Sequence, residues 1–198
     1  MVLTFDTETT GKIDWQADFR APHQPHICQL GAMFASPEGE LKAHLSLLIQ
    51  PNGWTIPAEA TAIHGITTDQ CMQYGVPIMT AMSALYNWAR LSTWIVGHNV
   101  AFDIRMVECE LARLNKPVLW EFKESHFCTM HNMTSVCKLP KPSGTKGYKF
   151  PKLAEAYKHA FGAEHDKQHD AFGDVQATAK LFFWMRAQGL VHPKLPKQ

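Results

Sequence analysis

The sequence predicts a mixed α/β fold, in which a central β-sheet is flanked by α-helices. Short apolar runs come first, and later apolar runs alternate with stretches of helical periodicity. This order is typical of a mixed sheet with helices on its faces, and not of a sandwich or a bundle. With 198 residues, 45% of them hydrophobic, the chain is long enough to fold around its own core without a disulfide or a structural metal.

Strands are predicted at four apolar runs. The first, Val2–Phe5, ends at acidic residues and has the character of a buried strand. The runs Ile27–Ala35 and Leu41–Ile49 are joined by a Pro-Glu-Gly turn, which predicts an antiparallel hairpin. The run Thr93–Val96 is a further short strand.

Helices are predicted at five places. Pro57–Gly65 has proline in its first turn and glycine at its end, and Pro77–Leu91 carries apolar residues at helical spacing. The other predicted helices are Val100–Leu114, Lys152–Phe161 and Asp170–Ala187.

The chain shows no internal repeat, so we expect a single domain over residues 1–187 and a short polar tail over 188–198. Nineteen basic against eighteen acidic residues give a net charge of +1, which neither requires nor excludes a polyanionic partner. Five cysteines without a CxxC pair are typical of free thiols in a reducing compartment.

No apolar run approaches the ~18 residues of a membrane span. Asp6 interrupts the stretch in which a signal peptide would be apolar. The sequence therefore predicts a cytoplasmic protein with no membrane partner, and it leaves the oligomeric state open.

Acidic residues occur at three separate places that the predicted fold brings to one edge of the sheet. Asp6 and Glu8 are two residues apart at the end of the first strand, so their carboxylates share a face and repel each other unless a cation lies between them. Asp103 opens the helix after the strand 93–96, and Asp174 lies one turn into the last helix. Oxygen ligands without clustered cysteine favour Mg²⁺ or Mn²⁺ over zinc. Four acids around two such ions suit phosphodiester displacement.

Each of these signals has a plainer explanation when it is taken alone. Two acids at a strand end are common on a solvated surface, and Asp103 suits the positive end of a helix capped by Asn99. His169 is either a solvated bystander, like the nearby His159 and His165, or a movable base beside a fixed metal ligand.

Taken together, three motifs resemble those of the DEDDh (DnaQ-like) 3′→5′ exonucleases, the superfamily of proofreading exonucleases and RNase T. The motifs are Asp6-Thr7-Glu8-Thr9-Thr10-Gly11, His98-Asn99-x-x-Phe102-Asp103 and His169-x-Ala171-x-x-Asp174, and they occur in the family's order. The segment Ile63-His64-Gly65-Ile66-Thr67 resembles the family's helix-end signature. The resemblance implies the ribonuclease H-like fold, in agreement with the predicted elements.

The resemblance also implies a role for each residue. Asp6, Glu8, Asp103 and Asp174 would hold two divalent ions, Mg²⁺ or Mn²⁺, and His169 would take the proton from the attacking water or orient that water. The terminal nucleotide would be bound by Thr7, Thr9, Ile63, His64, His98, Asn99 and Phe102. The implied reaction is hydrolysis of single-stranded or frayed DNA from its 3′ end, with release of nucleoside 5′-monophosphates.

Two alternatives stay open from the sequence. One is an RNA-trimming exoribonuclease of the same family, since no residue decides how the site treats a 2′-hydroxyl group. The other is a nucleic-acid-binding subunit associated with a polymerase. A polymerase or another replication or repair protein would in either case bind in trans.

Three further segments have two interpretations each. Lys12–Pro25 is either an insertion that shapes the substrate or a surface loop, and we favour the loop. Residues 138–152 hold five lysines with Tyr148 and Phe150, so they either follow a nucleic-acid backbone or form a solvated loop. A third group either binds zinc or belongs to a core stripe, and its spacing fits no familiar zinc pattern: His126, Cys128, His131 and Cys137.

Overall fold

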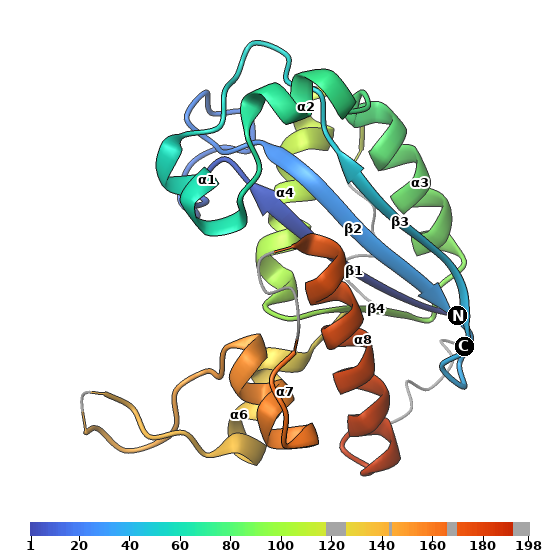
Figure 1. Ribbon diagram of the computed structural model, residues 1–198, viewed down its shortest axis with the longest axis vertical. Coiled ribbons are helices and arrows are strands. Elements are labelled where there is room, and N and C mark those ends of the chain that lie inside the picture. The colour runs from blue at the N-terminus through green and yellow to red at the C-terminus, as the bar shows by residue number, and fades with distance from the viewer. Residues whose placement is uncertain (118–125, 143, 166–169, 192–198) are drawn as a thin grey trace.

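The structure, a computed structural model, describes residues 1–117, 126–142, 144–165 and 170–191. It is built on a five-stranded sheet with the order β3-β2-β1-β4-β5 (Figure 1). The strands are β1 (Val2–Thr9), β2 (Ile27–Ala35), β3 (Leu41–Leu48), β4 (Trp94–Gly97) and β5 (His126–Cys128). β1 pairs antiparallel with β2 and parallel with β4, while β2–β3 is antiparallel and β4–β5 is parallel. The predicted mixed α/β class is confirmed.

Helices lie on both sides of this sheet (Figure 1). They are α1 (Ala58–His64), α2 (Thr68–Tyr74), α3 (Ile78–Arg90), α4 (Val100–Arg113), α6 (Thr129–Cys137), α7 (Leu153–Phe161) and α8 (Ala171–Ala187). No helix in the described ranges is long and apolar enough to cross a membrane.

The two faces of β1 pack against different helices. Leu3 and Phe5 belong to the core cluster that contains the buried residues of α3 and α4. Val2 clusters instead with Phe182 of α8. Since successive side chains of a strand alternate between faces, the even positions of β1, which include Asp6 and Glu8, lie on the side of α8.

The elements predicted from the sequence are present, with small shifts at their ends. β1 is longer than its apolar run, because its last residues continue to pair with β2 as far as Thr9. The short helix 57–65 has Pro57 at its N-cap and ends at Gly65, whose positive φ of 76° is typical of a glycine C-cap. The sequence analysis missed β5, α2 and α6. β5 has only three residues, too few to show a period.

The segment Lys12–Pro25 contains no helix or strand and is fastened to α4. The Arg105 Nη2 atom donates to the Ala17 carbonyl at 3.0 Å, and its guanidinium lies 3.6 Å from the centroid of the Phe19 ring. Arg113 Nη2 donates to the carbonyl oxygen of Gln24 at 2.6 Å. The segment is therefore a surface loop, and the arginines of α4 hold this loop against the helix.

The terminal tail is described only in part. Residues 188–191 follow α8, and residues 192–198 lie outside the described residues. The single-domain organisation over 1–187 stays a prediction.

Candidate active site

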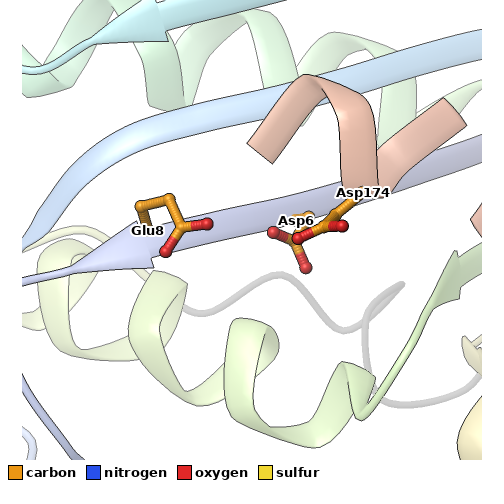
Figure 2. Close-up of side chains that lie close together, drawn as sticks. All are labelled: Asp6, Glu8 and Asp174. Carbon is orange, nitrogen blue, oxygen red and sulfur yellow. The ribbon is translucent and has the colours of Figure 1, made fainter. Parts of the chain in front are cut away.

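Three carboxylates meet where β1 passes beneath the first turn of α8. Asp6, Glu8 and Asp174 each offer a carboxylate oxygen, and these oxygens lie within 4.8 Å of one another. Figure 2 shows Asp174 reaching from α8 to Asp6, with Glu8 further along the same strand. Alternation along the strand places both β1 acids on one face, as the sequence analysis predicted, and α8 packs on that face.

The electrostatics of this cluster favour a bound cation. Burial, then the charge of Asp174, raises the pKa of Glu8 from 4.5 to about 8. Burial, then the charge of Asp103, holds the pKa of Asp6 well above its usual range. Both shifts mean that burial and the neighbouring charges disfavour the ionised acids at neutral pH. Because the donors are all carboxylate oxygens, the cluster fits a hard divalent ion such as Mg²⁺ or Mn²⁺.

Asp103 reaches the site from α4 and is held by β1. Its Oδ1 atom accepts from the Thr7 N–H at 3.0 Å and from the Thr7 hydroxyl at 2.8 Å. Burial raises the pKa of Asp103 to about 7, although the two bonds from Thr7 act in the opposite direction. Asp103 is not a member of the three-carboxylate group. Four acids were expected to come together, and three of them do. Its role as a metal ligand stays a prediction.

Gln29 of β2 binds the start of α8. Its Nε2 atom donates to Asp170 Oδ1 at 3.1 Å and to Ser46 Oγ at 3.2 Å, and its Oε1 atom accepts from the Ala171 N–H at 3.1 Å. Asp170 in turn caps the helix, since its Oδ2 atom accepts from the Gly173 N–H at 3.0 Å. This chain of hydrogen bonds fixes the turn that carries Asp174.

Gly31 lets α8 approach the sheet closely. A Cβ atom built at this position would lie 2.6 Å from both the carbonyl carbon and the carbonyl oxygen of Ala171. Side chains do not tolerate such distances, so only glycine fits here. Sequence reasoning missed Gln29, Gly31 and the capping role of Asp170. A polar residue inside the apolar run 27–35 was the available signal for Gln29.

A cavity of about 580 Å³ adjoins Glu8. It is lined by the residues predicted to bind the terminal nucleotide at Thr7, Thr9, Ile63, His64 and Phe102, together with the start of Lys12–Pro25 and part of α1. Ile63 is 60% exposed, which is unusual for a large apolar side chain and leaves it free to contact a ligand. The His64 ring is oriented by its Nδ1 atom, which accepts from the Ile66 N–H at 3.1 Å.

His98 and Asn99 do not line this cavity. The His98 ring has protein partners at both nitrogens, because Nε2 donates to the Pro151 carbonyl at 3.0 Å and Nδ1 lies 2.9 Å from Thr129 Oγ1. Burial lowers the pKa of His98 to about 4. Asn99 has a positive φ of 71° and its side chain does not cap α4, contrary to the simple N-cap interpretation. That either residue binds substrate stays a prediction.

The histidine predicted as the base, His169, lies outside the described residues. A second histidine, His165, is buried, and its Nε2 atom lies 3.6 Å from Asp174 Oδ1. Nothing in the sequence distinguished His165 from the other histidines near it.

The four residues weighed as a zinc site do not come together. In the part of the chain that the structure describes, the one group with metal-ligating geometry is the carboxylate cluster. Phe127 and Val136, which lie among those four residues, pack instead against the core of α7 and α8.

Comparison with known proteins places this fold and site in a family. The family model described as Exonuclease (RNase_T) matches residues 3–182. An uncharacterized exonuclease, CP81, of Escherichia phage 186 is 31% identical over a match that covers 68% of each chain. The DNA polymerase III subunit epsilon of Buchnera aphidicola is 28% identical, with 92% of this chain and 71% of that protein covered.

Solved structures with the same fold include E. coli Exonuclease I in complexes with the oligonucleotides dT13 and dA16. Their TM-scores are 0.72 and 0.73 at 20% sequence identity, and they match 93% and 96% of this chain. The chain spans only 40% and 42% of the length of those structures, and 17% of the 3′-5′ exonuclease DinG of Bacillus subtilis, to which it is 24% identical.

The chain therefore belongs to the exonuclease family and has its ribonuclease H-like fold. Within that family it is a DnaQ-like 3′→5′ exonuclease, a hydrolase that acts on phosphodiester bonds, and its carboxylate cluster fits the divalent metal that the family implies.

The raised pKa of Glu8 predicts how the stability of the metal-free protein depends on pH. The folded state holds the Glu8 proton more tightly than the unfolded state, so this contribution to stability is complete below about pH 4.5 and is lost as pH rises to about 8. In EDTA, we expect the Tm of Glu8→Gln to gain on that of the wild type between pH 5 and pH 8, and saturating Mn²⁺ to reverse the difference. Thermal unfolding scans measure this. Glu40→Gln, which changes an exposed carboxylate, is the control. If the Tm of E8Q depends on pH in the same way as the Tm of this control, the raised pKa of Glu8 is contradicted.

Loss of the Gln29 contacts is expected to impair turnover more than substrate binding. Gln29→Leu leaves the Ala171 N–H without its acceptor, which costs about 1–3 kcal/mol of unfolding free energy. Misplacement of Asp174 lowers kcat by about tenfold to a hundredfold, while KM stays near the wild-type value because the cavity is lined by other elements. Steady-state kinetics separate the two parameters. The control is Ser46→Ala, which removes only the hydrogen bond from Gln29 to the Ser46 hydroxyl. An equal kcat for the two variants would refute the role of Gln29 in positioning Asp174.

Proposed function

We propose that this exonuclease removes nucleotides one at a time from the 3′ end of single-stranded or frayed DNA and releases nucleoside 5′-monophosphates. The observation that carries the proposal is the position of the carboxylate cluster directly beside a cavity of about 580 Å³, which is the size of a small-ligand site. Since the cavity adjoins Glu8, a terminal nucleotide in it would place its phosphodiester next to the acids.

Asp6, Glu8 and Asp174, with Asp103 beside them, would hold two ions of Mg²⁺ or Mn²⁺. Bound there, the ions would make water more acidic and stabilise negative charge on the departing 3′ oxygen. The carboxylates fit this task because the charges of the ions offset the burial and the mutual repulsion that raise the pKa of Glu8 and of Asp6.

The chain's own side chains supply position and proton transfer. Phe102 and Ile63 offer apolar surface to the terminal base, and the fixed ring of His64 lies in the same cavity. Thr7 orients Asp103 through its N–H and its hydroxyl. His169 would accept the proton of the attacking water, as the resemblance to the family implies.

DNA is favoured as the substrate because the solved structures with this fold include Exonuclease I bound to DNA oligonucleotides. A replication or repair setting, in the cytoplasm and with a polymerase in trans, fits the similarity to a polymerase III epsilon subunit. An RNA substrate is the alternative outcome of the experiment below.

The substrate is identified by digestion of 5′-labelled single-stranded DNA, duplex DNA with a mismatched 3′ end, and single-stranded RNA. With Mg²⁺ or Mn²⁺, we expect a ladder that shortens from the 3′ end of the single-stranded DNA, with the mismatched end next and RNA slowest. EDTA should abolish it. Fastest loss of the RNA would overturn the choice of DNA, and cleavage of none of the three would overturn the proposal.

Asp103→Asn tests the metal assignment with the fold kept intact. Asparagine retains a side-chain oxygen that can accept from Thr7, but it removes the charge that a divalent ion needs. We expect kcat to fall by at least about a hundredfold, with a Tm in EDTA equal to or above that of the wild type because a buried charge is lost. Turnover close to the wild-type value would rule out Asp103 as a metal ligand.

A further inference from the structure

The chain between α6 and α7 forms an arm that stands out from the rest of the fold. α6 ends at Lys138, which has a positive φ of 50°. Pro140 and Tyr148 then form an antiparallel bridge, and the Lys149 N–H donates to the Leu139 carbonyl at 3.0 Å. Figure 1 shows this hairpin extending away from the sheet and the helices. Residues 138–142 and 144–152 are called the basic arm here.

Most of the positive charge of the arm is not neutralised within the described residues. Residues 138–152 contain five lysines and no acid. Lys149 is paired with Glu155 of α7 at 2.5 Å, so its charge is neutralised, whereas only the backbone N–H of Lys152 donates to that carboxylate and its exposed side chain keeps its charge. The other three, Lys138, Lys141 and Lys146, are exposed and form no ion pair within the described residues. A strand of phosphates is the ligand that such a row of cations suits.

Two aromatic rings accompany these lysines. Tyr148 is 44% exposed and Phe150 is 58% exposed, and Phe150 has one neighbouring ring, His131, at a centroid distance of 5.0 Å. Large apolar side chains that stay exposed beside lysines are typical of surfaces on which nucleic-acid bases stack. An acidic protein partner would explain the lysines but would not call for exposed flat rings.

Hydrogen bonds connect the arm to the catalytic edge of the sheet. The His98 ring binds the carbonyl of Pro151, where the arm ends, and Thr129, where α6 begins. His98 itself directly follows β4 and comes two residues before the start of α4, the helix that presents Asp103. Both chain segments that lead into the arm are therefore fastened to the same part of the sheet as the catalytic acids.

We propose that the basic arm binds the sugar–phosphate backbone of the substrate strand on the 5′ side of the terminal nucleotide. The inference rests on the proposed function, because it takes the cavity beside Glu8 as the place of the 3′ end. The three lysines that precede Tyr148 contact phosphates, and Tyr148 or Phe150 stacks on a base. Contacts of this kind are independent of sequence and act on strands long enough to leave the cavity and reach the arm.

The test compares salt dependence of binding for two variants of equal charge. One is Lys138→Gln, Lys141→Gln and Lys146→Gln together. The matched control is Arg90→Gln, Lys116→Gln and Lys180→Gln together, three exposed basic residues that lie elsewhere on the surface and form no ion pair within the described residues. Affinity for a 5′-labelled dT20 is measured by fluorescence anisotropy in EDTA, where no cleavage occurs, between about 50 and 200 mM salt. Hydrolysis of dT2 by each variant with Mn²⁺ checks that the catalytic site is intact.

The arm variant is expected to bind dT20 more weakly at low salt and to lose about 2 from the slope of log K against log salt, since each phosphate contact on a single strand contributes about 0.7. The control variant is expected to keep the wild-type slope. If the slopes of log K against log salt are equal for the two variants, while the wild type still binds and digests dT20, the arm proposal fails and the proposed function stands. If the wild type neither binds nor digests dT20 or its RNA counterpart rU20, the proposed function fails and the arm proposal fails with it.

Discussion

The close approach of α8 to β2 is the contact on which the carboxylate cluster depends. Gly31 allows the main chain of Ala171 to come to a distance that a Cβ atom would not permit. Gly31 is also the partner of Asp6 in the register of β2 and β1. The helix is thus seated on β2 at the level of Asp6, and its first turn then carries Asp174 over the next strand. The carboxylates meet because the backbones pack closely and not because the side chains attract each other.

The fold has to hold these acids together against their repulsion. Burial and neighbouring charges raise the pKa of Glu8 and of Asp6, so the ionised cluster opposes folding when no cation is bound. Hydrogen bonds from the scaffold oppose the separation, through Thr7 at Asp103 and through Gln29 at the start of α8. The scaffold itself thus positions the acids, and a bound divalent ion would supply the positive charge that the scaffold lacks.

The sequence predicted the acids more completely than the contacts that position them. Asp6 and Glu8 follow from the period of two along a strand, and the order of strands and helices places Asp174 at the same edge. Gln29 meets Ala171 across 142 positions of the chain, and only the packing of α8 reveals that contact. The clamp between Thr7 and Asp103 joins β1 to α4 in the same way. β5 escaped prediction because a strand of three residues has no measurable period.

The net charge of +1 could not indicate a polyanionic substrate, because opposite charges are separated on this molecule. The catalytic edge gathers acids, which repel phosphate unless divalent ions are bound. The basic arm gathers lysines instead. Since salt screens charges beyond about 8–10 Å, a phosphate strand responds to the nearer of these two regions and not to their sum. On the proposal made above, cations on the arm would hold a strand whose 3′ end enters the cluster of acids, and the bonds of His98 to Pro151 and Thr129 fasten the arm to the end of β4.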